Sequence, residues 1–191
     1  MKMTGKLLSL VTSFAFLLNS GISLAKAPDF PKNAKVGDQT LLLNGAGTRT
    51  ATFLAIKVYD MAFYNPVLIS KDTEVFSSAF PKKLEIRYRR DFSVEDTRKA
   101  WNYQFKDSSG TPEPEYADGL KQLVSYQEAI KKGDVQSFEL DDSGSRFYFN
   151  QALKGTIPGK PFRDALLKIF FGSNPPTRDL KDDLLKERSA P

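Results

Sequence analysis

The sequence predicts an α+β fold in which a large antiparallel sheet carries a layer of helices on one face. Strand-like segments come first, two helical segments follow, and a group of short strands precedes two more helices. This order lacks the regular strand–helix alternation that is typical of a parallel sheet. The chain of 191 residues also shows no internal repeat and no change in composition that would mark a second domain.

The N-terminal segment has the three-part pattern of a secretory signal peptide. Two lysines precede an apolar run at 7–18, and small residues follow as far as Ala25. The run is shorter than the roughly 20 residues that a membrane-spanning helix needs. We therefore expect a signal peptide at 1–25, with cleavage after 27 as the alternative, and a single domain at 28–191 without an integral membrane segment.

The composition excludes several kinds of chemistry. Cysteine and histidine are both absent, which excludes Ser–His and Cys–His catalysis, the usual zinc sites and disulfides. An exported protein held together by its core alone suits the bacterial periplasm. The formal net charge of +5 falls to +2 after removal of the first 27 residues, because 25 basic residues then face 23 acidic ones. That charge is too small to predict a nucleic-acid partner, and we expect neither a metal nor a cofactor.

The first half of the sheet is predicted from three segments. A short strand at 40–43 ends in the turn signal Asn44-Gly45. The segment 53–64 is rich in β-branched and aromatic residues and apolar on both faces, which predicts a central strand that ends before Pro66. Apolar and charged residues alternate over 84–89, which predicts a strand that is buried on one face.

The middle of the chain predicts two helices. Ser93 is a suitable N-cap, and acidic residues follow it in the first turn. Apolar residues then continue at helical spacing to Phe105, and Asn102 lies beside this apolar stripe. A Ser/Gly/Pro-rich break at 108–114 separates this helix from a second one, which we expect to extend to Ile130.

The last part of the chain predicts three strands and two helices. A hairpin pairs 136–140 with 147–149, and a further strand follows at 152–157. The next helix has clear boundaries, because Pro161 stands at its start and Gly172 after its end. A polar helix over 178–187 closes the chain.

Two stretches of this sequence resemble a known family. Gly45-Ala46-Gly47-Thr48-Arg49, followed by Ala55-Ile56-Lys57-Val58-Tyr59, resembles the paired signature of chalcone isomerase and its non-plant relatives. The stretches at 161–172 and 180–185 are similar to the ending of bacterial exported chalcone isomerase-like proteins. The likeness extends from about Leu41 to Leu185, nearly all of the chain after the signal peptide.

The resemblance implies a fold, a cleft and two alternative activities. The family's fold is an open-faced β-sandwich, with a ligand cleft between the sheet and the helices. Plant-type members cyclise chalcones to flavanones, and other members bind fatty acids. Arg49 matches the family's arginine, Asn102 falls on its ligand-contacting asparagine by an ungapped count, and Arg98 lies near its lysine.

Three positions depart from the enzyme's pattern. Where the enzyme has hydroxyl-bearing side chains, this chain has Leu54, Glu95 and Ile169. Removal of a single donor to a developing oxyanion commonly lowers a rate by about a hundredfold or more. The resemblance therefore implies that efficient isomerisation is lost and that the apolar cleft with its arginine is kept.

We accordingly expect a non-catalytic protein that binds a fatty acid or a similar hydrophobic carboxylate, with Arg49 as the anion anchor. In fatty-acid-binding relatives a tyrosine assists the arginine, and Tyr59 is its nearest counterpart here. If 50–52 forms a tight turn, however, Arg49 lies opposite residues near Phe53, far from Tyr59.

Alternatives remain open at this point. The protein could be a chalcone isomerase-type enzyme, or a scaffold whose cleft is filled by its own side chains. Arg49 could form a structural ion pair with Glu95, Asp60 or another acid, and Asn102 could be a helix-edge amide bonded to the backbone.

Overall fold

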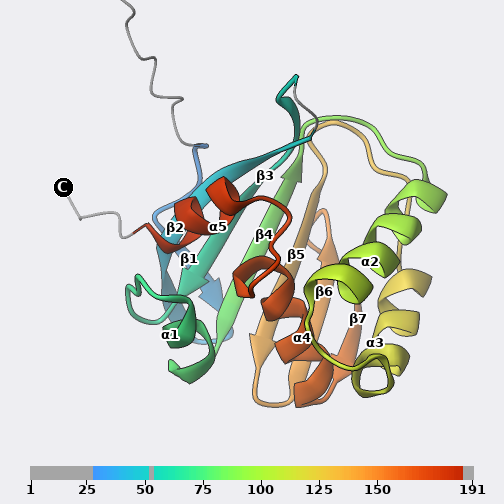
Figure 1. The fold of residues 1–191 in the computed structure, drawn as a ribbon. Helices are drawn as coiled ribbons and strands as arrows, with labels where there is room; N and C mark the ends of the chain where they lie inside the picture. Colours follow the sequence, from blue (N-terminus) through green and yellow to red (C-terminus); the bar gives the residue numbers. More distant parts are fainter. Residues whose placement is uncertain (1–27, 52–53, 187–191) are drawn as a thin grey trace, which may run out of the picture.

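A computed structural model describes residues 28–51 and 54–186 (Figure 1). The predicted signal peptide and both of its cleavage positions lie outside the described residues, as do Phe53 and the last residue predicted for the final helix. In the described part, seven strands form one sheet in the order of the sequence. Each strand runs antiparallel to its neighbours.

The strands follow one another as a meander. They are β1 (Asn33–Val36), β2 (Gln39–Ala51), β3 (Ile56–Asn65), β4 (Lys82–Tyr88), β5 (Val135–Asp141), β6 (Gly144–Phe149) and β7 (Ala152–Pro158). The predicted hairpin and the strand after it are confirmed as β5, β6 and β7. The burial pattern of β4 alternates strictly, as its sequence predicts.

The helices are inserted between strands or follow the last one. They are α1 (Asp72–Ser77), α2 (Val94–Ser108), α3 (Glu113–Ser125), α4 (Lys160–Phe171) and α5 (Arg178–Leu185). All of them lie on the same side of the sheet (Figure 1). The predicted α+β fold, with an antiparallel sheet and a layer of helices on one face, is therefore confirmed.

The main core lies between the sheet and the helices. Phe105 of α2 is fully buried there, with its ring centroid 5.2 Å from that of Tyr116 and 5.1 Å from that of Phe162. A smaller cluster lies on the other face of β2 and β3, where Ala62 and Tyr64 pack against Phe30 near the start of the described chain. Because β3 is buried on both faces, its prediction as a central strand is confirmed.

The prediction of a turn at Asn44-Gly45 is wrong, because β2 continues through both residues. The register with β3 shifts between Leu43 and Gly45, so that Asn44 is the extra residue of a β-bulge. Its buried side chain donates to the carbonyl oxygens of Ile69 at 3.0 Å and Leu184 at 2.8 Å. It also accepts from the backbone nitrogen of Ile69 at 2.7 Å, so this amide joins three parts of the chain.

The two glycines of this stretch allow α5 to lie directly on β2. A Cβ atom on Gly45 would stand 2.2 Å from the carbonyl oxygen of Asp183, and one on Gly47 would stand 2.7 Å from the Cβ of Asp183. No side chain fits in such a space. The Gly-Ala-Gly sequence before Arg49 therefore has a packing reason, independent of any ligand.

Two of the boundaries that differ from the prediction have a local structural cause. The strand β3 begins at Ile56 rather than 53, because Ala55 has a φ of +50° and belongs to the turn. Helix α3 ends at Ser125 rather than Ile130. Ile130 instead exchanges two backbone hydrogen bonds of 2.9 Å with Phe92, which joins the α3–β5 loop to the β4–α2 loop.

Candidate functional site

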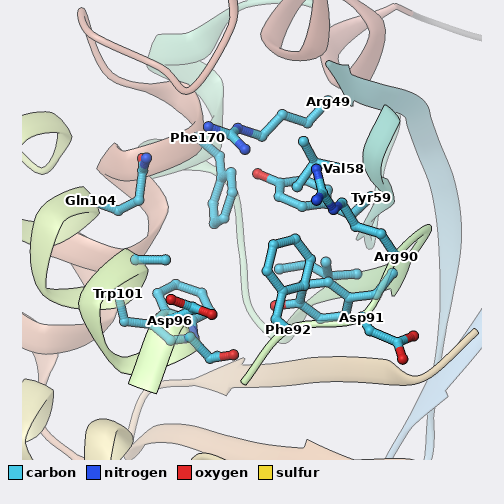
Figure 2. A pocket seen from close by; sticks show the side chains of 14 residues that line it. Arg49, Val58, Tyr59, Arg90, Asp91, Phe92, Asp96, Trp101, Gln104 and Phe170 are labelled. Carbon is cyan, nitrogen blue, oxygen red and sulfur yellow. The ribbon is translucent and has the colours of Figure 1, made fainter. Parts of the chain in front are cut away.

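A pocket of about 440 Å³ lies between the sheet and α2 (Figure 2). The sheet contributes one wall, the loop after β4 contributes the rim, and α2 with one residue of α4 contributes the opposite wall. The lining residues in chain order are Arg49, Val58, Tyr59, Ile86, Tyr88, Arg90, Asp91, Phe92, Asp96, Thr97, Ala100, Trp101, Gln104 and Phe170.

Aromatic rings form much of the pocket surface. The ring of Tyr88 stands edge-on to Tyr59 at 6.1 Å between centroids and edge-on to Phe92 at 5.7 Å. Trp101 lines the opposite wall from α2, with its ring centroid 5.5 Å from that of Phe138 in the core. Rings fixed by such contacts make a preformed apolar cavity.

Arg49 is placed at the pocket by the pairing of β2 with β3. It is the register partner of Tyr59, and its Cζ lies 5.7 Å from the centroid of the Tyr59 ring. Figure 2 shows the guanidinium reaching across the pocket toward Phe170. A tight turn at 50–52, which would have placed Arg49 opposite residues near Phe53, does not form, because β2 continues to Ala51 and the register shifts between Arg49 and Thr50.

The alternative in which Arg49 forms a structural ion pair is also wrong for the two acids proposed. Asp60 accepts from Arg89 Nε at 2.8 Å and from Thr48 Oγ1 at 2.7 Å, and Glu95 pairs with Lys99 at 2.8 Å. Within residues 28–51 and 54–186, Arg49 makes no ion pair, and its Nε is buried without a hydrogen-bond acceptor. A buried donor of this kind is rare in folded proteins.

The hydroxyl groups of the pocket differ in what they bind. Tyr88 Oη donates to Gln136 Oε1 at 3.0 Å, and Thr97 Oγ1 donates to the carbonyl oxygen of Ser93 at 3.0 Å. Tyr59 Oη has no hydrogen-bond partner among the residues that the structure describes. Burial raises the pKa of Tyr59 above its ordinary value, and the nearby charge of Arg49 opposes this more weakly. Tyr59 is therefore a neutral donor that is open to a ligand.

The hydroxyl of Tyr88 begins a short series of buried side-chain hydrogen bonds that leads away from the pocket. Gln136 Nε2 donates to Gln127 Oε1 at 2.8 Å, and Gln127 Nε2 donates to the carbonyl oxygen of Leu123 at 2.9 Å. Burial raises the pKa of Tyr88 as well, with a further rise from Tyr59 and a smaller opposing effect of Arg49. This chain fixes the Tyr88 ring in place.

Asn102, the third site residue expected from the sequence, does not line the pocket. It is exposed on α2, and its Nδ2 donates to the carbonyl oxygen of Arg98 at 2.8 Å. Gln104 lines the pocket instead. A signal for it was present in the sequence, because Thr97, Trp101 and Gln104 follow one another at helical spacing on one face.

The three positions that depart from the enzyme's pattern also lie away from the pocket. Leu54 is 66% exposed near the β2–β3 turn, Glu95 is exposed on α2, and Ile169 is fully buried in the core. None of these three positions supplies a polar group to the pocket, whose polar lining includes Arg49, Tyr59 and Gln104 as well as the carboxylates of Asp91 and Asp96.

The described residues contain neither a metal-binding cluster nor a membrane-spanning helix. No group of three or more acidic, histidine or cysteine side chains in them is arranged to hold a metal ion. No helix among them is long and apolar enough to cross a membrane.

Comparisons with known proteins agree with this architecture. A family model described as chalcone isomerase-like matches residues 25–186. The crystal structure of a fatty-acid-binding protein from Arabidopsis thaliana has a similar fold, with a TM-score of 0.66, 14% sequence identity, and coverage of 82% of this chain and 90% of that one. No curated protein is detectably similar in sequence. The chain belongs to the chalcone isomerase-like family.

Proposed function

We propose that the protein binds a fatty acid or a similar hydrophobic carboxylate in this pocket, without catalysing a reaction, and that Arg49 anchors the carboxylate. The observation that carries this proposal is the state of Arg49. Its guanidinium reaches into an apolar pocket, and its Nε is buried without an acceptor in the described part of the chain.

The energetic reason is the free energy lost when a buried donor is left without a partner, about 1–3 kcal/mol for each group. A carboxylate offers two oxygens to the fork of N–H groups on a guanidinium, and such bidentate pairs are among the strongest hydrogen bonds in proteins. Tyr59 lies beside Arg49 with its hydroxyl uncommitted, so it can donate a further hydrogen bond to the same carboxylate.

The apolar part of the remaining pocket surface suits a hydrocarbon tail, whereas Asp91 and Asp96 also line the pocket and would repel a carboxylate placed near them. Ile86, Phe92, Trp101 and Phe170 line it, and its volume of about 440 Å³ lies within the roughly 300–1,000 Å³ typical of small-molecule sites. Because this volume is open rather than filled by side chains, ligand binding is favoured over a role as a ligand-free scaffold. The similarity in fold to a fatty-acid-binding protein of Arabidopsis supports the same class of ligand.

We propose further that the protein is exported to the periplasm. The support is the signal-peptide pattern at 1–25 and the absence of cysteine. N-terminal sequencing of protein released from the periplasm tests this. A first residue of Lys26, or of Pro28 for the alternative cleavage, is expected, whereas a chain that keeps Met1 in the cytoplasm contradicts it.

The ligand itself is tested by mass spectrometry of organic extracts from gently purified protein. We expect wild-type protein to carry a fatty acid. The Arg49→Ala variant should carry at least about tenfold less of it, because a charge-assisted hydrogen bond contributes about 1.5–3 kcal/mol. Lys121→Ala on α3 is the matched control, since it removes one exposed positive charge away from the pocket. Equal amounts of fatty acid in wild type and Arg49→Ala would contradict the anchor.

A further inference from the structure

We propose that the end of the sheet at which the pocket lies docks on an anionic phospholipid surface. We call this surface the docking end and define it by Leu54, Ile56, Lys57, Arg90 and Lys132. This inference goes beyond ligand binding. It rests on the proposed function in one respect: if the pocket binds a lipid, docking would allow that lipid to pass between bilayer and pocket.

The apolar part of the docking end consists of Leu54 and Ile56, where β3 begins. Leu54 is 66% exposed and Ile56 is 40% exposed, two residues apart in the chain. Single exposed aliphatic residues are ordinary on protein surfaces. Both stand at the beginning of β3, which we call the apolar tip, and Figure 1 shows that this end of β3 projects beyond the helices. Such a tip can enter the boundary between headgroups and acyl chains at shallow depth.

Two loops join the apolar tip at the same end of the sheet. The loop after β4 is held beside β3, because the backbone nitrogen of Arg89 donates to the carbonyl oxygen of Val58 at 3.0 Å. The loop before β5 is held beside the loop after β4 by the paired hydrogen bonds of Phe92 and Ile130. The two loops run together at the top of Figure 1. Residues far apart in the sequence therefore share one surface.

The charges of this surface are unbalanced toward the positive side. Asp60 is neutralised by Arg89 at 2.8 Å, and Asp91 is neutralised by Lys131 at 3.0 Å. The exposed side chains of Lys57, Arg90 and Lys132 have no acidic partner within residues 28–51 and 54–186. Asp134 and Asp96 add negative charges nearby: Asp134 accepts from the backbone nitrogen of Lys131 at 2.7 Å, and Asp96 lines the pocket together with Arg90. An excess of positive charge remains.

An apolar tip and a basic surround together make the two signals that stable membrane association requires. Each lysine or arginine near an anionic bilayer strengthens the association by about fivefold at physiological salt. Arg90 and Phe92 also line the pocket, so the pocket rim and the docking end are continuous. A lipid could therefore pass between bilayer and pocket without crossing water.

The test is co-sedimentation with vesicles. Wild-type protein is expected to sediment with vesicles that contain phosphatidylglycerol, much less with phosphatidylcholine alone, and progressively less as salt is raised. Two double variants, Leu54→Ser with Ile56→Ser and Lys57→Glu with Lys132→Glu, are expected to lower binding by about tenfold or more.

The matched control replaces two apolar residues of similar exposure away from this end. Val67 follows the opposite end of β3 and is 55% exposed, and Phe76 on α1 is 40% exposed. Val67→Ser with Phe76→Ser should leave vesicle binding unchanged, and circular dichroism melting should show that every variant folds. Equal sedimentation with neutral and anionic vesicles, or equal losses in the control and apolar-tip variants, would overturn the docking proposal.

Ligand binding in solution separates this proposal from the proposed function. The apolar-tip and lysine variants should bind free fatty acid as well as the wild type does, because none of the replaced residues lines the pocket. Fatty-acid binding without vesicle binding in the wild type overturns docking alone. Vesicle binding without fatty-acid binding overturns the ligand and leaves docking supported.

Discussion

Arg49 and Tyr59 are direct register partners across β2 and β3, with the guanidinium carbon 5.7 Å from the centroid of the tyrosine ring. The pair brings together a permanent cation and a neutral hydroxyl donor at the pocket, and neither group is committed to a hydrogen bond in the described part of the chain. Since both side chains come from a two-stranded hairpin, their separation is fixed by backbone hydrogen bonds rather than by flexible loops.

Replacement of Tyr59 by phenylalanine should weaken ligand binding without affecting the fold. The ring stays beside Arg49, and only the uncommitted hydroxyl is removed. Loss of one hydrogen bond to a charged carboxylate is expected to lower affinity by about 1.5 kcal/mol, or roughly tenfold. Trp101 lines the pocket and is the chain's one tryptophan, so its fluorescence reports a fatty-acid titration directly. An unchanged affinity in Tyr59→Phe would show that this hydroxyl does not contact the ligand.

Replacement of Gly45 by alanine should displace α5 from β2. The added methyl would stand 2.2 Å from the carbonyl oxygen of Asp183, and backbone atoms cannot move aside as a side-chain tip can. Overpacking of this kind destabilises by about 1–3 kcal/mol. Hydrogen exchange measured by mass spectrometry should show faster exchange of the α5 amides.

Gly110→Ala serves as the control for this variant. Gly110 also resists substitution because its φ is +57°, but a Cβ there would meet nothing within 4 Å. Its α5 amides should exchange as in the wild type. If both variants accelerate hydrogen exchange in α5, or if neither does, then the close approach at Gly45 does not determine the position of this helix.

The sequence predicted those elements whose signals are local. The strict alternation of β4 and the Pro161 and Gly172 boundaries of α4 depend on residues within each segment, and the structure agrees with both. Asn44-Gly45 is different, because the same dipeptide suits a hairpin turn and a bulge. The choice between them depends on Leu184, which accepts from Asn44 across 140 positions of sequence.

Only part of the candidate site's lining was predicted, because the rest depends on contacts between segments that are distant in the sequence. Arg49 and Tyr59 were found through short motifs, but their pairing required the true length of β2 and its second register shift. The sequence did not single out Gln104 as a lining residue. Counting residues from the preceding strand placed the ligand contact at Asn102 instead, and Asn102 lies on the side of α2 that faces away from the pocket. Helical spacing from Trp101 is the better guide here, because α2 presents one face to the sheet.

Lys82 should make stability depend on pH in the alkaline range. Its buried ammonium donates to the carbonyl oxygens of Ser78 at 2.9 Å and Ala79 at 2.7 Å. Burial lowers the pKa of Lys82 from its ordinary value of 10.5 to about 8, and the charge of Arg163 acts in the same direction. Between these two pKa values the unfolded chain binds more protons than the folded one, so this group makes the free energy of unfolding rise with pH from about 8 to 10.5.

Comparison with Lys82→Met isolates this effect from other titrating groups. Burial raises the pKa of Tyr59 and Tyr88, which acts in the opposite sense as the unfolded tyrosines ionise near pH 10. Urea unfolding at several pH values between 7.5 and 10 should show that wild type gains stability relative to the methionine variant. A difference that stays constant with pH would mean that folding does not perturb Lys82.

Ring closure of a hydroxychalcone should proceed no faster with this protein than with its Arg49→Ala variant. Cyclisation requires donors that polarise the ketone, and loss of one such donor lowers rates by about 10²–10³. In the pocket, Thr97 and Tyr88 already donate to protein acceptors, which leaves Tyr59 as the uncommitted hydroxyl among the described lining residues. Absorbance of the chalcone, followed with each protein and with buffer, measures the rate. A rate that exceeds buffer and falls in Arg49→Ala would identify the pocket as catalytic, because a binding site alone lowers the free substrate concentration without forming flavanone.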